Sequence, residues 1–291
     1  MSRWLRQSIK DFCNESEHNT LRDAGNQKAW EEPIIGFSRG DDLLYDRLKE
    51  DIGAFYWTPL EIYRKTFPEE KEVTSDKLTI ISWILPHTEQ IKQDQRKQTK
   101  YPSESWVRAR IFGEQFNDKL RCFVVDILSN RGYHALVPVL SPLWAIRTSK
   151  RYGLASNWSE RHTAFVSGLG TFGLCDGLIT PVGKAIRSGS VIADISIEPT
   201  PRPYRALHDY CLFYTKETCR NCVDRCPAGA ITEKGHDKDR CNDYIRSIVS
   251  PHNRSQYGLE GGGCGLCQAL VSCESKIPSE YDVRSVPDTT N

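Results

Sequence analysis

Residues 219–231 read CRNCVDRCPAGAI, and the three cysteines in this stretch have the spacing C-x2-C-x3-C-P. Bacterial two-cluster ferredoxins carry one more cysteine three residues earlier. The cysteine before the proline then ligates the other 4Fe–4S cluster. Lys216 occupies the position of that earlier cysteine here. The stretch therefore predicts an iron–sulfur module in which one ligand must come from elsewhere in the chain.

The remaining cysteines are concentrated around this stretch. The chain has 291 residues and 11 cysteines, of which Cys13, Cys122 and Cys175 are scattered over the first two-thirds. Scattered thiols are typical of small buried apolar residues. The others crowd into residues 211–273, which is typical of metal ligands: Cys211, Cys219, Cys222, Cys226, Cys241, Cys264, Cys267 and Cys273.

The spacing of these cysteines divides them into two sets, each suited to one 4Fe–4S cluster. We expect the first cluster to take Cys219, Cys222 and Cys273, and the second to take Cys226, Cys241, Cys264 and Cys267. Cys211 is the nearest unused thiol for the first cluster, and the loop 211–219 would have to bulge to deliver it. A non-cysteine ligand or an open position on that cluster is the alternative.

Structural zinc is a competing interpretation, because Cys219-x2-Cys222 and Cys264-x2-Cys267 are zinc-type pairs. The intervening residues 223–263 are long for a single zinc ribbon. Zinc would also leave the other four cysteines of the crowded region without a role. Two 4Fe–4S clusters therefore explain the pattern better.

Composition narrows the class of protein. Lys and Arg total 39 against 38 Asp and Glu, so the net charge of +1 gives no overall electrostatic case for a nucleic-acid partner. We expect no membrane span, because the sequence has no apolar run of about 18 residues. The N-terminus shows no export signal, which predicts a cytoplasmic chain with reduced thiols and no disulfide framework.

The first two-thirds of the chain has an α/β pattern. An apolar run at 77–85 predicts a strand buried on both faces, and 134–140 predicts a second strand. Between them, 105–132 predicts a long amphipathic helix or two helices in sequence, and the order suggests a parallel crossover. Further helices are expected at 41–53 and near 159–167, with strands near 176–181 and 190–197. The proline-rich segment 198–205 reads as a linker. The predicted division is a core at 1–205, an iron–sulfur module at 206–277 and a polar tail at 278–291.

Residues 168–173, GLGTFG, match the dinucleotide fingerprint G-x-G-x-x-G, but in the wrong context. That fingerprint requires a preceding strand and a following helix. Here a helical pattern precedes the glycines and a strand-like one follows, which argues against a dinucleotide site. Gly168, Gly170 and Gly173 would instead allow the backbone to approach a large ligand, or to form a tight turn.

The segment 156–195, followed by the two cysteine sets, resembles the epoxyqueuosine reductase family, relatives of the reductive dehalogenases. The shared pattern includes the Glu160-Arg161 pair, the glycines at 168–173, and Gly183 and Gly189. The resemblance implies a nitroreductase-like, cobalamin-binding α/β core fused to a two-cluster ferredoxin module. It also implies an oxidoreductase whose clusters deliver electrons to cobalamin for reductive cleavage or elimination. The cofactor-binding candidates are Glu160, Arg161, Gly168, Gly170 and Gly173.

The chain departs from this family at a position that matters for the substrate. Members that modify tRNA have an acidic residue, the presumed proton donor, where this chain has Leu154. The nearby Tyr152 is our candidate catalytic proton donor, whereas His162 is not favoured as a cobalt ligand. The substrate stays unassigned between a small molecule and a modified nucleoside, with tRNA not favoured, and a ferredoxin- or flavodoxin-type protein would supply the electrons. The alternative function is an electron carrier without cobalamin chemistry.

Overall fold

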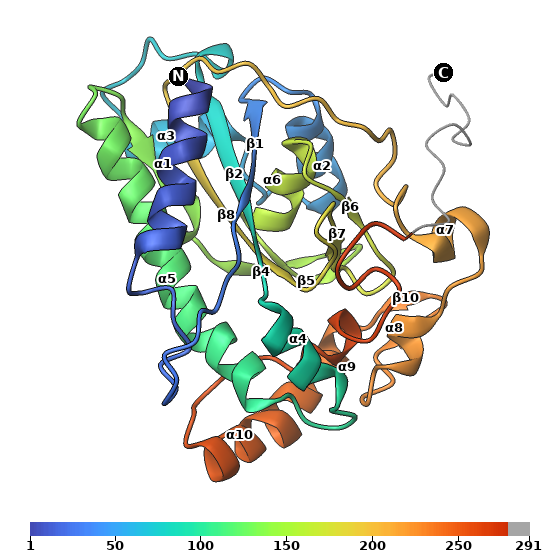
Figure 1. Cartoon of the computed structure of the whole chain (residues 1–291). Helices are drawn as coiled ribbons and strands as arrows, with labels where there is room; N and C mark the ends of the chain where they lie inside the picture. The colour runs from blue at the N-terminus through green and yellow to red at the C-terminus, as the bar shows by residue number, and fades with distance from the viewer. Residues whose placement is uncertain (279–291) are drawn as a thin grey trace.

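The computed structural model describes residues 1–278, so all but the first residue of the predicted polar tail lies outside the described residues. The core of the described part is a four-stranded sheet in the order β1-β2-β8-β3 (Figure 1). Its strands are β1 (Ile34–Arg39), β2 (Thr79–Pro86), β8 (Ile186–Ala193) and β3 (Ala135–Leu136), and every neighbouring pair is antiparallel. The mixed α/β class is confirmed.

The expected parallel crossover is wrong in one respect. Because β8 pairs antiparallel with both β2 and β3, these two strands run parallel to each other but are not neighbours. In the register Gly189 lies opposite Trp83, and a Cβ on Gly189 would lie 2.4 Å from the Trp83 ring. The second strand is also shorter than predicted, because Pro138 begins a 3-10 turn at Pro138–Leu140.

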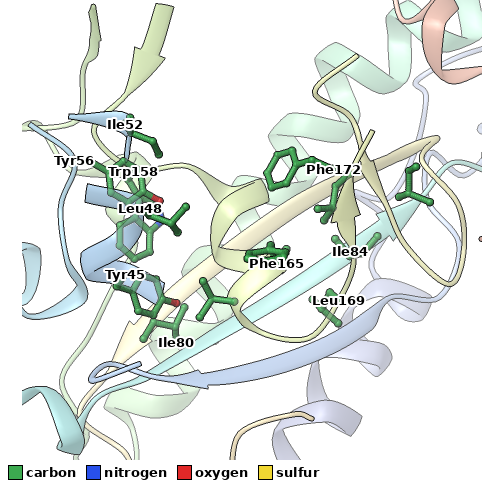
Figure 2. Close-up of a cluster of buried hydrophobic side chains, with 14 of the residues drawn as sticks. Tyr45, Leu48, Ile52, Tyr56, Ile80, Ile84, Trp158, Phe165, Leu169 and Phe172 are labelled. Atoms are coloured by element: carbon green, nitrogen blue, oxygen red, sulfur yellow. The ribbon is translucent and has the colours of Figure 1, made fainter. Parts of the chain in front are cut away.

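Helices cover both faces of the sheet, which explains the continuous apolar run of β2. Ile81, Trp83 and Leu85 pack with α1 (Ser2–Glu15) and α5 (Glu104–Ser129). Ile80 and Ile84 point to the other face, where Figure 2 shows them with side chains from α2 (Leu44–Ile52) and α6 (Glu160–Val166). Strand residues alternate between faces, so a strand between two helical layers is apolar throughout.

The helix bounds follow local signals in the sequence. The Ser103 hydroxyl accepts a hydrogen bond from the Trp106 N–H at 3.3 Å and starts α5, a single helix close to the predicted 105–132. Thr58 and Glu61 form a capping box at the start of the helix Pro59–Thr66. The remaining helices are α3 (Pro59–Thr66), α4 (Glu89–Arg96), α7 (Leu212–Lys216), α8 (Asn221–Asp224), α9 (Lys238–Tyr244) and α10 (Ser250–Tyr257). None of the helices within residues 1–278 is long and apolar enough to span a membrane.

Short hairpins and turns complete the described chain. The two-stranded pairs are β4 (Ile146–Ser149) with β5 (Gly153–Ser156), β6 (Thr171–Phe172) with β7 (Leu178–Ile179), and β9 (Ile231–Thr232) with β10 (Gly235–His236). A short π-helix at Ile245–Val249 joins α9 to α10, and short 3-10 helices lie at Ser75–Lys77 and Leu266–Gln268. The linker predicted at 198–205 has neither helix nor strand.

Gly183 fixes the last cysteine-bearing segment to the core. It adopts φ +83°, and a Cβ there would lie 2.1 Å from the Glu274 carbonyl oxygen. The next N–H, that of Lys184, donates to the Cys273 and Glu274 carbonyls at 2.9 Å. Only glycine allows this approach without strain, so Gly183 determines where Cys273 lies relative to β8.

We expect Gly183→Ala to lower the free energy of unfolding by about 2–4 kcal/mol, from a left-handed backbone penalty of about 1–2 kcal/mol and a comparable cost of overpacking. Gly132→Ala is the matched control, because Gly132 also has φ +83° but a Cβ there would meet nothing within 4 Å. Thermal unfolding under anaerobic conditions should show a larger drop for Gly183→Ala. Equal drops would mean that the backbone contact to Glu274 contributes nothing.

Candidate functional site

The crowded cysteines line two cavities. The small cavity is lined by Cys211, Cys219, Cys222 and Cys273. The large cavity, about 620 Å³, is lined by Cys226, Cys241, Cys264 and Cys267, together with Cys175. Apart from Cys175, these are the two sets that the sequence spacing separates. Whether they ligate clusters stays a prediction.

Short elements place these thiols. Cys211 immediately precedes α7, and Glu217 with φ +56° turns the chain toward Cys219. Cys222 lies on α8 and Cys267 on the 3-10 turn at 266–268. The five-residue α7 therefore occupies the loop 211–219 that was expected to bulge, which explains how Cys211 reaches the small cavity.

A glycine also positions the second set. Gly265, between Cys264 and Cys267, has φ +64°, and a Cβ there would lie 2.1 Å from Trp106 Nε1. The loop can therefore lie directly on α5, and both line the large cavity.

Within residues 1–278, no three His, Cys, Asp or Glu side chains are arranged as ligands of one metal ion. A single zinc ion draws its four ligands to one centre. In a 4Fe–4S cluster each cysteine binds a different iron, so the ligands are spread around a larger body. The ligands of a 4Fe–4S cluster are therefore expected around a cavity and not at a single point.

Charged side chains from three elements line the rest of the large cavity. Helix α5 contributes a polar stripe of four residues, Arg110, Glu114, Asp118 and Arg121. Helix α6 adds Glu160 and Arg161, and β8 adds Arg187. Arg121 is almost completely buried and pairs with Glu114 at 2.9 Å and Asp118 at 2.5 Å. This stripe was not predicted from the sequence, although positions 110, 114, 118 and 121 recur at helical spacing.

Two arginines of this wall repel each other. Arg187 pairs with Glu114, and the positive charge of Arg187, together with burial, lowers the pKa of Arg110 to about 9. Burial would raise the pKa of Glu114, but Arg187 and Arg121 lower it to about 2. The wall therefore keeps a charged carboxylate and still has positive charge to offer an anionic ligand group.

Glu160 is a buried acid on this wall. Within residues 1–278 neither carboxyl oxygen makes a hydrogen bond of standard geometry, and Oε1 lies 3.5 Å from Arg121 Nε. Burial raises the pKa of Glu160 to about 7, with Glu114 adding to the rise, while Arg121, the Ser190 hydroxyl and Arg187 oppose it. Glu160 can therefore hold a proton near neutral pH.

We expect the contribution of Glu160 to the stability of the protein to fall by about 3 kcal/mol as the pH rises from about 4.5 to about 7, and to level off above that. The reason is that the folded state binds the Glu160 proton more tightly than the unfolded state, so ionisation favours unfolding. Glu160→Gln keeps the neutral form and should remove this slope. Anaerobic thermal unfolding of both proteins between about pH 5 and about pH 8 tests this difference. If the stabilities of the two proteins change with pH in parallel, Glu160 is not the titrating group.

Other predicted residues lie away from the large cavity. The Tyr152 hydroxyl donates to Asp51, and burial together with this carboxylate raises the pKa of Tyr152 to about 12. His162 Nδ1 lies 2.8 Å from the Ser159 hydroxyl. Neither residue is among those lining the large cavity, whereas Arg161 is, and its guanidinium also donates to the Asp176 carbonyl.

The glycines of the 168–173 run pack against backbone. A Cβ on Gly168 would lie 2.8 Å from the Pro201 carbonyl oxygen, and one on Gly170 would lie 2.3 Å from that of Ile179. Gly173 lines the small cavity. Helix α6 precedes the run, β6 lies within it and β7 follows, which is the inverted context that argues against a dinucleotide site.

Cys175 and Lys184 are further residues that the sequence analysis missed. Lys184 is 2% exposed and lines both cavities, and its Nζ lies 3.2 Å from Cys175 Sγ. A lone cysteine carries no spacing signal. The β6–β7 hairpin and the turn after it bring these two residues to the cysteine sets.

This fold is known from solved structures. A selenomethionine-labelled epoxyqueuosine reductase has a TM-score of 0.50 and 18% identity to this chain. The alignment covers 98% of this chain and 70% of that protein. The catabolic reductive dehalogenase NpRdhA, aligned over 85% of this chain and 31% of its own, also has a TM-score of 0.50, at 15% identity. The chain has an epoxyqueuosine reductase-like fold. The resemblance seen in the sequence is thereby confirmed at the level of the fold.

Sequence comparison points the same way over a shorter stretch. An epoxyqueuosine reductase of Bacillus anthracis is 27% identical over 117 residues, which span 38% of this chain and 28% of that protein. No family model matches the chain. The solved structures and the shorter sequence match therefore agree on an epoxyqueuosine reductase-like fold.

Proposed function

We propose that this chain is a reductase of the epoxyqueuosine reductase type, in which two 4Fe–4S clusters and cobalamin carry out a two-electron reductive cleavage or elimination. The observation that carries the proposal is the position of the second cysteine set. Cys226, Cys241, Cys264 and Cys267 line the same cavity as the arginine-rich wall. A cluster held there would lie directly beside a ligand in that cavity.

The two sets suit consecutive steps of electron transfer. Cys219, of the first set, is partly exposed, and its sulfur lies near the Ser272 hydroxyl at the surface. A reduced ferredoxin- or flavodoxin-type donor would therefore deliver electrons to the first cluster, and the second would pass them to the large cavity. An electron carrier needs no such cavity, so this alternative is not favoured.

The walls of the large cavity suit a large ligand with an anionic group. A volume of about 620 Å³ lies within the range of cofactor and ligand sites. Trp144 offers flat apolar surface, and Arg110 offers a positive charge, which fits a corrin with its phosphate-bearing tail. When bound, cobalamin would supply the reducing centre.

The protein's own residues would hold the ligand and manage the proton. Arg110 and Arg161 would bind anionic or carbonyl oxygens, and Arg121 would keep Glu160 in place. Glu160 would hold the proton that reductive cleavage consumes. Tyr152 is the alternative donor, but its hydroxyl is engaged by Asp51.

Anaerobic purification from cells supplied with cobalamin, followed by iron, sulfide, cobalt and zinc analysis, tests the proposal. We expect about eight irons with matching sulfide and about one cobalt per chain. About eight irons without cobalt would favour the electron carrier, and zinc without sulfide would overturn the iron–sulfur assignment. The loaded protein should then be assayed with epoxyqueuosine-containing tRNA, the free nucleoside and small organic halides, since the substrate class remains to be assigned.

A further inference from the structure

Lys184 occupies a position between the two cysteine sets. The residue follows Gly183 in the turn between β7 and β8, and its side chain lines both cavities. Cys222 and Cys273 line the small cavity with Lys184, and Cys175 and Cys267 line the large cavity with it. Cys222 and Cys273 belong to the first set and Cys267 to the second, so Lys184 lies beside cysteines of both sets.

The space around this ammonium group is tightly defined. Its Nζ lies 3.2 Å from Cys175 Sγ. Gly177 lies beside the pair, and a Cβ there would meet Lys184 Cδ at 3.0 Å and Cys175 Sγ at 3.3 Å. Any larger residue at 177 would therefore press on both side chains. The backbone N–H of Lys184 is fixed by the Cys273 and Glu274 carbonyls.

A buried ammonium group needs compensating negative charge. Burying an unpaired ion costs several kcal/mol even after relaxation, and the ammonium group of Lys184 contacts the sulfur of Cys175 rather than a carboxylate. Two clusters, each bound by four thiolates, carry net negative charge that increases on reduction. Their charge would supply the missing partner on both sides of Lys184.

We infer that Lys184 is a charge bridge between the two clusters: its fixed ammonium group, positioned by Cys175, stabilises the reduced form of both and so raises their reduction potentials. This inference rests on the proposed function. In each step a cluster takes up one electron, from the donor protein or from the other cluster, and no covalent bond forms or breaks. Hydrogen bonds and charge near the sulfurs are established determinants of cluster potential.

Potentiometric titration monitored by electron paramagnetic resonance, on cluster-loaded protein without substrate, tests the charge bridge. Lys184→Met should shift the reduction equilibrium of at least one cluster about tenfold toward the oxidised form, ~59 mV for a one-electron couple. Lys184→Arg keeps the charge and should stay close to the wild type. Wild-type potentials in a Lys184→Met protein that retains about eight irons would overturn the inference.

A second pair of variants leaves Lys184 in place, in case Lys184→Met does not fold. Cys175→Asp puts a carboxylate opposite the ammonium group, whereas Cys175→Asn has the same shape without charge. We expect Cys175→Asp to favour the oxidised clusters relative to Cys175→Asn, and equal potentials for the two would overturn the charge bridge. A wild-type protein without iron would instead refute the proposed function, so the two failures are distinguishable.

Discussion

Replacing Cys211 with serine is expected to halve the iron content of the purified protein, from about eight irons per chain to about four. Cys211 lines the small cavity with Cys219, Cys222 and Cys273. Lys216 stands where ferredoxin-type runs carry the missing cysteine, so Cys211 would supply the fourth ligand of the first cluster. The second set should keep its cluster, because its four cysteines line the other cavity.

The control for this experiment is Cys122→Ser. Cys122 is exposed on α5 and outside both cysteine sets, so its removal should leave about eight irons. Iron and sulfide analysis, with electron paramagnetic resonance of the reduced protein, provides the readout. A Cys211→Ser protein that retains about eight irons and two cluster signals would show that the first cluster has a non-cysteine ligand or an open position.

The close pairs Cys219 with Cys222 and Cys264 with Cys267 could be predicted from local spacing, and Cys226 and Cys273 were assigned from the pattern of two-cluster ferredoxins. Ligands two or three residues apart must meet on one turn, whatever the rest of the fold does. The same holds for α5, whose apolar periodicity and Ser103 cap are local signals. The neighbours within the sheet depend on long-range pairing instead. The insertion of β8 between β2 and β3 requires Gly189 to pass under Trp83, and no short pattern announces it.

The charged residues that line the large cavity could not be predicted from the sequence for a different reason. Arg110, Glu114 and Arg121 lie on a helix, where charged residues at this spacing usually face solvent. Only the tertiary fold brings β8 and the loop around Gly263 over that stripe. Cys175 and Lys184 are nine residues apart and meet through a turn. The residues that distinguish this cavity from a generic ferredoxin site were therefore the least accessible to sequence reasoning.

Gly263→Trp is expected to weaken cobalamin binding by roughly ten- to hundredfold, because overpacking costs about 1–3 kcal/mol and each 1.4 kcal/mol is a factor of about ten. Gly263 lines the large cavity. A Cβ there would meet only Arg110 Nε, at 3.8 Å, which is ordinary contact. A side chain can therefore grow from this position into the cavity without backbone strain, and an indole would occupy the space beside Arg110.

Gly263→Ala is the matched control, since its methyl group adds no more than that contact and should leave cobalamin affinity unchanged. Binding is measured by anaerobic titration of cobalamin into cluster-loaded protein. About eight irons in both variants would show that the neighbouring Cys264 still functions as a ligand. Unchanged affinity in Gly263→Trp would place cobalamin outside this cavity. If the wild type binds none, the arginine wall must serve another anionic ligand, and the clusters deliver their electrons to that molecule or to a protein partner.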